Sequence, residues 1–233
     1  MDERNFAPMI GDAPTSMANV YERRNDGCWR SADYTIAIMA PRVSFITEGQ
    51  APVSARAFFA DGDPGPLVSS WAQVPEMLDV TLPFVGMILG ASSVSARLKE
   101  LVILRTSALM QCRFCVNAHT EVAIDVGLTE SEIRALRGEI AIGDTFSTPG
   151  ELALLRWIDA VATQRGAVDD DIADDLGAHF HDHEVVEVTM LIGATLMLNR
   201  YASALQLPNG DEAIGRLQQL GYDTVLTGQG AFA

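Results

Sequence analysis

Residues 96–119 read ARLKELVILRTSALMQCRFCVNAH, and this stretch decides the fold of the chain. Apolar residues recur in its first half at helical spacing, which predicts a helix that follows a capping serine and ends near Gln111. A second helix is predicted from Cys112 to about Val126, where Gly127 is suited to stop it in the left-handed conformation. We expect the first helix to fold back antiparallel toward the second.

Helical patterns with sharp stops continue on both sides of this pair. No convincing alternating strand pattern appears in the core, so the predicted class is all-α. The last long helix, from about Asp182 to Leu205, is apolar on nearly all sides, and such a helix must be buried in the core or between subunits. Pro208 ends this helix. Before it, one or two short helices are predicted over residues 66–89, limited by Pro75 and Pro83, and another over residues 129–136 behind a Thr129–Glu132 capping box. A further helix is predicted from Thr148, with Glu151 at capping-box spacing, to a residue before Gly166, and another helix start at residues 169–171.

Residues 1–50 differ from the remainder because they mix Pro, Gly, Asp and Asn with one apolar stretch, residues 34–40. We interpret them as a mostly irregular N-terminal extension with a strand or a turn of helix, packed on the main domain or on a neighbouring subunit. A turn cluster at residues 61–66 marks the start of the core. The predicted organisation is an extension, residues 1–50, followed by a helical domain, residues 51–233.

The composition indicates a globular protein with an acidic field. Of the 233 residues, 48% are hydrophobic and 20% are charged, which suffices for a sizeable core. The formal net charge of -15 repels phosphate backbones and anionic lipids, so nucleic acid and membranes are poor partners. The first residues lack the basic and apolar regions of a signal peptide, and no apolar stretch has bilayer-spanning length. We therefore expect a cytoplasmic protein.

Three cysteines are too few for a framework of several disulfides. Cys28 lies in the polar extension and is interpreted as an incidental thiol. Cys112 and Cys115 form a close pair, which in a reducing compartment is typical of redox or metal chemistry. Structural zinc is disfavoured because the chain offers no second cysteine pair and only one nearby histidine, His119.

A second group of histidines also has the spacing of metal ligands. His179, His183 and Glu187 would form a stripe on one continuous helix. However, a cap at His181 favours a helix that begins after this residue and leaves His179 outside it. We therefore expect no metal site here.

Cys112, Cys115 and His119 share one face of the second helix, because they are three and four residues apart. Two thiols one turn apart can close a disulfide, and the positive end of a helix stabilises a thiolate. His119 can accept or return a proton near neutral pH, and Glu100 on the preceding helix can orient its imidazole or hold a bridging water. Each residue alone also has an ordinary interpretation: a chance cysteine pair, a core or surface histidine, a solvated glutamate. Together, at these spacings, they predict an activated dithiol.

Glu100, Cys112, Cys115 and His119 at these spacings resemble the signature of the AhpD-like alkylhydroperoxidases of the carboxymuconolactone decarboxylase superfamily. The resemblance covers roughly residues 50–210 and does not include the extension. It implies an all-helical bundle that assembles as a homotrimer or homohexamer, with active sites at or near subunit contacts. It extends through ARLKELVIL at residues 96–104, CVNAH at residues 115–119, GLTE at residues 127–130 and NRY at residues 199–201.

The resemblance implies a thiol-dependent peroxidase or thiol–disulfide oxidoreductase that reduces hydroperoxides. Cys115 would be the peroxidatic thiol, which passes through a sulfenic acid. Cys112 would supply a proton and then close the disulfide, while His119 and Glu100 would form the proton relay. An external thiol reductant would restore the pair. No nicotinamide or flavin cofactor is expected, because the chain has no nucleotide-binding glycine motif after a strand.

Two other functions stay open. The superfamily also contains cofactor-free decarboxylases, so His119 and Glu100 could act as acid and base of a lyase or isomerase on a small carboxylated metabolite. Those members generally lack the cysteine pair, which favours the redox branch for this chain. The third hypothesis is a redox-responsive assembly protein, in which the disulfide state changes the contacts between subunits.

Overall fold

The computed structural model describes residues 21–23, 29–31 and 40–224. The chain divides into two compact units, residues 1–39 and residues 40–233. Among the described residues, no helix combines the length and apolarity needed to cross a membrane.

The first unit contains a short antiparallel pair of strands. β1 (Tyr21–Arg23) pairs with β2 (Trp29–Ser31), with Glu22 opposite Arg30. The sequence patterns do not predict this pair. The apolar stretch at residues 34–40, for which a strand or a turn of helix is predicted, lies outside the described residues except for its last member, and so does Cys28.

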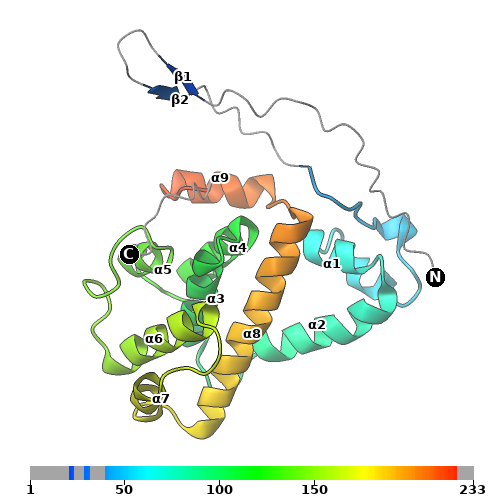
Figure 1. Cartoon of the computed structure of the whole chain (residues 1–233). Helices are drawn as coiled ribbons and strands as arrows, with labels where there is room; N and C mark the ends of the chain where they lie inside the picture. The colour runs from blue at the N-terminus through cyan, green and yellow to red at the C-terminus, as the bar shows by residue number, and fades with distance from the viewer. Residues whose placement is uncertain (1–20, 24–28, 32–39, 225–233) are drawn as a thin grey trace, which may run out of the picture. The chain divides into compact units, whose positions relative to one another are not determined.

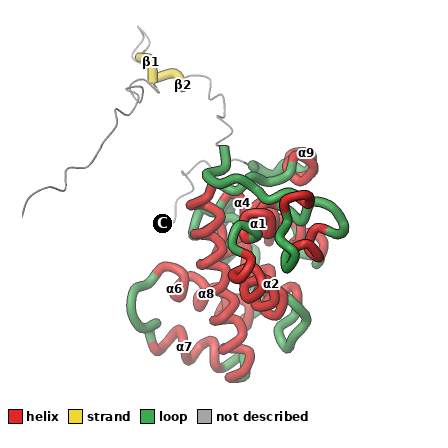
Figure 2. Tube along the Cα trace, turned by 90° about the vertical axis from the view of Figure 1, so that its right-hand side faces the viewer, coloured by secondary structure: helices red, strands yellow, loops and turns green. Residues whose placement is uncertain are grey.

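The second unit consists of helices and connecting loops over the residues that the structure describes, which confirms the all-α prediction (Figure 1). Two views agree that α6 and α7 lie on one side of the long helix α8 and that α1 and α2 lie on the other (Figures 1 and 2). The elements are the 3-10 helices η1 (Glu48–Gln50) and η2 (Arg56–Phe59), followed by α1 (Pro66–Trp71), α2 (Pro75–Leu89), α3 (Ala96–Leu109), α4 (Arg113–Asp125), α5 (Glu130–Leu136), α6 (Pro149–Thr163), α7 (Asp170–Gly177), α8 (Asp182–Leu205) and α9 (Asp211–Gln219).

Helix α3 forms the centre of this unit, because it packs against α4, α6 and α8. Every residue from Lys99 to Ala108 is buried. Its two buried cations have partners: Lys99 donates to the carbonyl oxygen of Ile88 at 2.8 Å, and Arg105 binds the carboxylate of Asp159 at 2.7 Å. These contacts offset the cost of burying charge and allow a helix with ionic residues to occupy the core.

Several helices begin or end where their capping residues predict. Ser95 accepts a hydrogen bond from the N–H of Leu98 at 3.3 Å and starts α3. Thr129 and Glu132 form the predicted capping box of α5. Gly127 follows α4 with a φ of 85°, the left-handed conformation predicted for it.

The start of α8 also follows the prediction. The helix begins directly after His181, whose N–H donates to the carboxylate of Glu184 at 2.9 Å. His179 precedes the helix, so it does not share a continuous helical stripe with His183 and Glu187. The capping contact therefore decides how these histidines are arranged.

The end of α8 at Leu205 agrees with the predicted bound, and its C-cap Gln206, which has a φ of 57°, lies two residues before Pro208. Two other features of the helix ends differ from the prediction. Pro83 lies inside α2 instead of limiting it, and its exposed position lets water bind the carbonyl group that loses a helical partner. The carboxylate of Glu151 binds Arg97 at 2.9 Å, and α6 has no side-chain cap.

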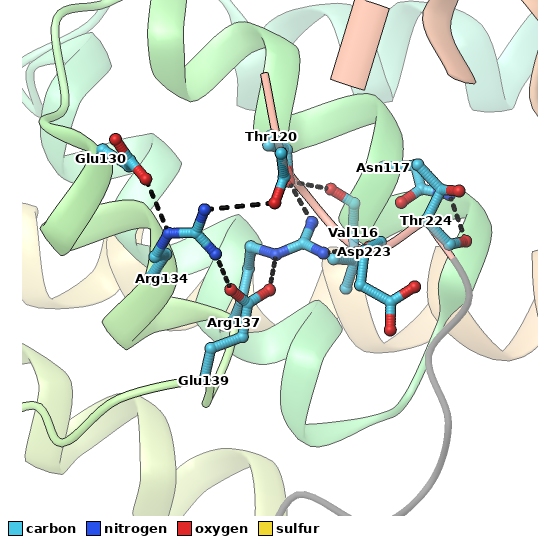
Figure 3. A network of polar contacts seen from close by, with 10 residues as sticks. Val116, Asn117, Thr120, Glu130, Arg134, Arg137, Glu139, Asp223 and Thr224 are labelled. Carbon is cyan, nitrogen blue, oxygen red and sulfur yellow. Dashed lines mark hydrogen bonds and ion pairs between the residues drawn. The ribbon is translucent and has the colours of Figure 1, made fainter. Parts of the chain in front are cut away.

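The segment after α9 docks on α4 and α5, a contact between sequence-distant residues that the helical patterns do not predict (Figure 3). The guanidinium of Arg137 donates to the hydroxyl of Thr120 at 2.8 Å and to the backbone carbonyl of Asp223. The ring of Tyr222 lies 5.1 Å from the guanidinium of Arg134 and 5.3 Å from that of Arg137. The two arginines thus hold the end of the described chain against the helix that carries the cysteines.

A first prediction concerns Glu132, a carboxylate that Arg97 binds. Arg97 lies on α3 and joins three helices, because it binds Glu132 of α5 and Glu151 of α6. Burial alone would raise the pKa of Glu132, but the hydrogen bonds from Arg97 and Thr129 together hold this pKa below its usual 4.5. A carboxyl group with a lowered pKa in the folded state stabilises the protein above its unfolded pKa, and the stabilisation is lost as the pH falls below that value.

We expect Glu132→Gln to lower the free energy of unfolding by about 1 kcal/mol at pH 7 and by less at pH 3.5. Urea unfolding at both pH values measures the difference. The matched control is Glu76→Gln, an exposed first-turn glutamate of α2. An equal loss at both pH values would contradict the role of the ionised carboxylate.

Candidate active site

The two cysteines lie where α3 turns into α4. Gln111 adopts the left-handed conformation, and Cys112 follows as the N-cap of α4, with its N–H bound to the carbonyl of Ser107 at 3.0 Å. The Sγ atom of Cys112 accepts a hydrogen bond from the N–H of Cys115 at 3.3 Å. A disulfide joins the two cysteines, whose Cα atoms are 5.3 Å apart. The pair therefore lies at the positive end of the α4 dipole, where a thiolate is stabilised once the disulfide is reduced.

His119 and Glu100 are in direct contact. Nδ1 of His119 on α4 lies 3.0 Å from Oε2 of Glu100 on α3, so no bridging water is needed. The Glu100 side chain is 7% exposed and the His119 side chain 23%, which places the carboxylate in the interior and lets the imidazole reach solvent. His119 follows Cys115 by one helical turn, so the two side chains share a face of α4.

The disulfide is covered by apolar groups. Cys112 is fully buried and Cys115 is 6% exposed, which makes Cys115 the more accessible of the two. Both pack against Ala202 and Leu207 at the end of α8. The outer part of the cluster consists of the partly buried residues Phe45, Leu67, Phe114, Tyr201 and Leu205.

Part of this cover comes from residues 42–47, which we call the strap. The N–H of Arg42 donates to the carbonyl of Leu205 at the end of α8, and the N–H of Ile46 donates to a carbonyl of α1, both at 3.0 Å. Phe45 lies between these two attachments and packs against the cysteine cluster. The strap belongs to the segment assigned to the extension from the sequence, and the helical patterns do not identify its contact with the cysteines.

Two asparagines that the sequence patterns do not identify as site residues hold the cysteine turn in place. Asn117 is fully buried on α4, and its Nδ2 donates to Oδ1 of Asn209 at 3.1 Å. The same Nδ2 donates to the carbonyl of Thr224 at 3.1 Å (Figure 3). Nδ2 of Asn209 donates to the carbonyl of Phe114, between the cysteines, at 2.9 Å. The available signal was the position of Asn117, two residues after Cys115.

The four residues predicted from the sequence are thus brought together in two neighbouring pairs, a disulfide and a histidine–carboxylate contact. The first supports thiol–disulfide exchange and the second supports proton transfer. Within the part of the chain that the structure describes, no group of three or more His, Cys, Asp or Glu side chains is placed to hold a metal ion.

Comparison with known proteins identifies the family to which the chain is related. The sequence profile of the carboxymuconolactone decarboxylase family matches residues 75–160, a range that contains all four candidate residues. A crystal structure of a protein of unknown function from Agrobacterium tumefaciens, provisionally named an antioxidant defence protein AhpD, is 30% identical. The match covers 60% of this chain and 97% of that one, with a TM-score of 0.55.

Two further crystal structures share the fold. An uncharacterized peroxidase-related protein from Ralstonia eutropha, described as an alkylhydroperoxidase AhpD core, is 17% identical over 74% of this chain and 94% of its own, with a TM-score of 0.66. A debrominase in complex with 2,3,4-tribromopyrrole is 16% identical over 78% of this chain and 98% of its own, with a TM-score of 0.63. At these identities the likeness is one of fold alone.

Proposed function

Because the chain belongs to the AhpD-like branch of the carboxymuconolactone decarboxylase superfamily, we propose that it is a thiol-dependent peroxidase or thiol–disulfide oxidoreductase that reduces hydroperoxides. The observation that carries this proposal is the disulfide at the start of α4 beside the direct contact of His119 with Glu100. A dithiol at a helix N-terminus supplies the nucleophile and the resolving thiol, and the histidine–carboxylate pair moves the protons.

In the first step, the thiolate of reduced Cys115 attacks the terminal oxygen of the hydroperoxide while its proton resides on His119. The O–O bond breaks, Cys115 becomes a sulfenic acid, and the alkoxide leaves as an alcohol with the proton of the Cys112 thiol. Glu100 stabilises the imidazolium that forms on His119, because its carboxylate lies 3.0 Å from the ring nitrogen.

In the second step, the thiolate of Cys112 attacks the sulfur of the Cys115 sulfenic acid. The S–S bond forms, the S–O bond breaks, and hydroxide leaves as water with the proton from His119. The sum is one hydroperoxide and two thiols converted to one alcohol, one water and one disulfide. An external thiol reductant returns the pair to the dithiol.

The assignment of Cys115 as the attacking thiol rests on accessibility. Cys115 is the more exposed cysteine, and it lies on the face of α4 that also carries His119. Cys112 is fully buried at the N-cap, where its sulfur contacts the N–H of Cys115. A buried thiol adjacent to the attacking one is suited to resolve the intermediate.

The test of this assignment treats the reduced protein with one equivalent of hydroperoxide and follows its mass. We expect the unsubstituted chain to lose two hydrogens and Cys112→Ser to carry a trapped sulfenic acid at Cys115. Cys115→Ser should stay unoxidised at residue 112 on the same time scale. Cys28, which is present in all three proteins, is the internal control for non-selective oxidation. Absence of oxidation at both Cys112 and Cys115 would refute the peroxidase proposal.

A separate prediction concerns the proton relay. Removal of general acid–base catalysis lowers rates by about 100- to 10,000-fold, so we expect His119→Ala to slow disulfide formation by at least about 100-fold. Glu100→Gln should slow it less and should also shift its pH profile, because Glu100 acts through the charge of His119. The matched control is Glu121→Gln, a substitution on α4, the helix that carries His119. A rate loss in Glu100→Gln without any change of pH profile would assign Glu100 a purely structural role.

A lyase or isomerase is the second candidate, since the contact of His119 with Glu100 is itself an acid–base pair that does not involve sulfur. The double variant Cys112→Ser, Cys115→Ser separates the two functions. Turnover of a small carboxylated substrate that survives in this variant would favour the lyase.

The proposed oligomer is a homotrimer or homohexamer, and exposed apolar residues on two neighbouring helices support it. α2 contacts α8, and each helix presents apolar side chains to solvent at helical spacing, the arrangement typical of an interaction surface. The exposed apolar residues are Met77, Val80, Met87 and Leu89 on α2, and Val186, Met190 and Met197 on α8.

We expect the unsubstituted protein to have three or six times the 25.1 kDa mass of one chain by light scattering. Met190→Glu and Met87→Glu should each lower the mass toward that of a single chain, because a carboxylate in an apolar interface is costly. Val53→Glu is the matched control, since Val53 is 82% exposed and lies outside both helices. A monomeric unsubstituted protein would contradict the prediction.

A further inference from the structure

A cavity of about 480 Å³ lies between the strap, the start of α1 and the loop from α8 to α9. Its volume is in the range of small-molecule sites. None of the four candidate active-site residues lines it. The cavity is therefore distinct from the disulfide and from the histidine–carboxylate contact.

Two residues nevertheless connect the cavity to the cysteines. Phe45 lines the cavity and also packs against the cluster that contains Cys112 and Cys115. Asn209 lines the cavity and donates to the carbonyl of Phe114, the residue between the cysteines, at 2.9 Å. One aromatic side chain thus contacts both the cavity and the cluster that contains the cysteines.

The lining of the cavity selects for a chemical class. Phe45, Ile46, Phe59 and Pro66 provide apolar contact surface. The charged residues of the lining, Glu48 and Asp63, are both acidic. Carboxylates repel an anionic ligand, and the net charge of -15 acts in the same direction. An uncharged organic molecule with an apolar body fits these conditions.

We propose that this cavity binds the organic part of a neutral hydroperoxide and that Phe45 of the strap controls its access to Cys115. This inference rests on the proposed peroxidase function and adds a binding site, a preference for uncharged over carboxylated substrates, and a specificity-determining residue. All residues that line the cavity lie outside residues 75–160, the range matched by the family profile.

The geometry of the strap explains how Phe45 is held. The backbone of Arg42 is fixed to α8 and that of Ile46 to α1. Gln73 adds a third attachment, because its Nε2 donates to the carbonyl of Ser44 at 2.8 Å and to the hydroxyl of the same residue at 3.0 Å. With the backbone attached on both sides, a change of the Phe45 rotamer is the smallest motion that opens the cavity toward the cysteines.

The binding experiment uses the full-length oxidised protein and two unreactive probes in calorimetry. 2-Phenyl-2-propanol is the alcohol formed from cumene hydroperoxide, and 2-methyl-2-phenylpropanoate carries a carboxylate in place of its hydroxyl group. We expect the alcohol to bind at least about tenfold more tightly than the carboxylate. Thr47→Trp, which places an indole on the lining, should weaken alcohol binding about tenfold. The control Val53→Trp, on an exposed residue outside the lining, should leave it unchanged.

The kinetic experiment compares cumene hydroperoxide with hydrogen peroxide as oxidants of the reduced protein. Phe45→Ala should change the ratio of the two kcat/KM values by at least about fivefold, because only the organic substrate needs the cavity. Thr47→Trp should slow the reaction with cumene hydroperoxide and leave that with hydrogen peroxide unchanged.

The outcomes separate the cavity from the peroxidase function. If the alcohol binds and Thr47→Trp weakens this binding, but neither oxidant reacts with Cys115, the peroxidase function is refuted and the binding site is supported. If both oxidants react but the probes bind equally, or neither substitution changes the ratio, the cavity proposal is overturned while the peroxidase function stands.

Discussion

The packing of α3 against α4 is the constraint on which the remainder of the site depends. α3 carries Glu100 into the interior, where a carboxylate is costly unless a hydrogen-bonding or charged partner receives it. His119 is that partner at 3.0 Å. The contact fixes the axial position and the rotation of α4 relative to α3. Because His119 is one turn beyond Cys115, it also fixes the imidazole on the face of α4 that carries Cys115. This interaction gives the buried carboxylate a partner and orients the imidazole of the proposed acid–base group.

The parts of the fold that could be predicted from the sequence depend on contacts between residues three or four positions apart. Ser95 caps α3, Gly127 follows α4 and His181 precedes α8 because each makes a hydrogen bond with a residue three positions away. The same short range places Cys112 near Cys115. Each of these signals lies within a short window of sequence. The helices and the residues of the candidate site could therefore be predicted without knowledge of how they are arranged in space.

The parts that could not be predicted depend on partners that are far away in the sequence. The strap is held by Arg42 on the carbonyl of Leu205, 163 positions later, and the end of the chain by Arg137 on the backbone of Asp223. An extended segment has no periodicity that reports where it lies, so its place over the cysteines is a property of the packed fold. Pro83 is a different case. A proline removes a backbone hydrogen bond and stops a buried helix, but it is tolerated on an exposed face, where water binds the carbonyl group that lost its partner.

The cover over the cysteines introduces two opposing effects on their chemistry. Burial among apolar side chains disfavours a thiolate, whereas the N-terminus of α4 favours it. The arrangement separates these effects in space: the sulfur atoms lie at the helix end, and the proposed proton carrier His119 is more exposed to solvent than Glu100. A covered dithiol beside a partly exposed histidine is consistent with peroxide chemistry, and the strap, which supplies part of the cover, is a component of the proposed active site.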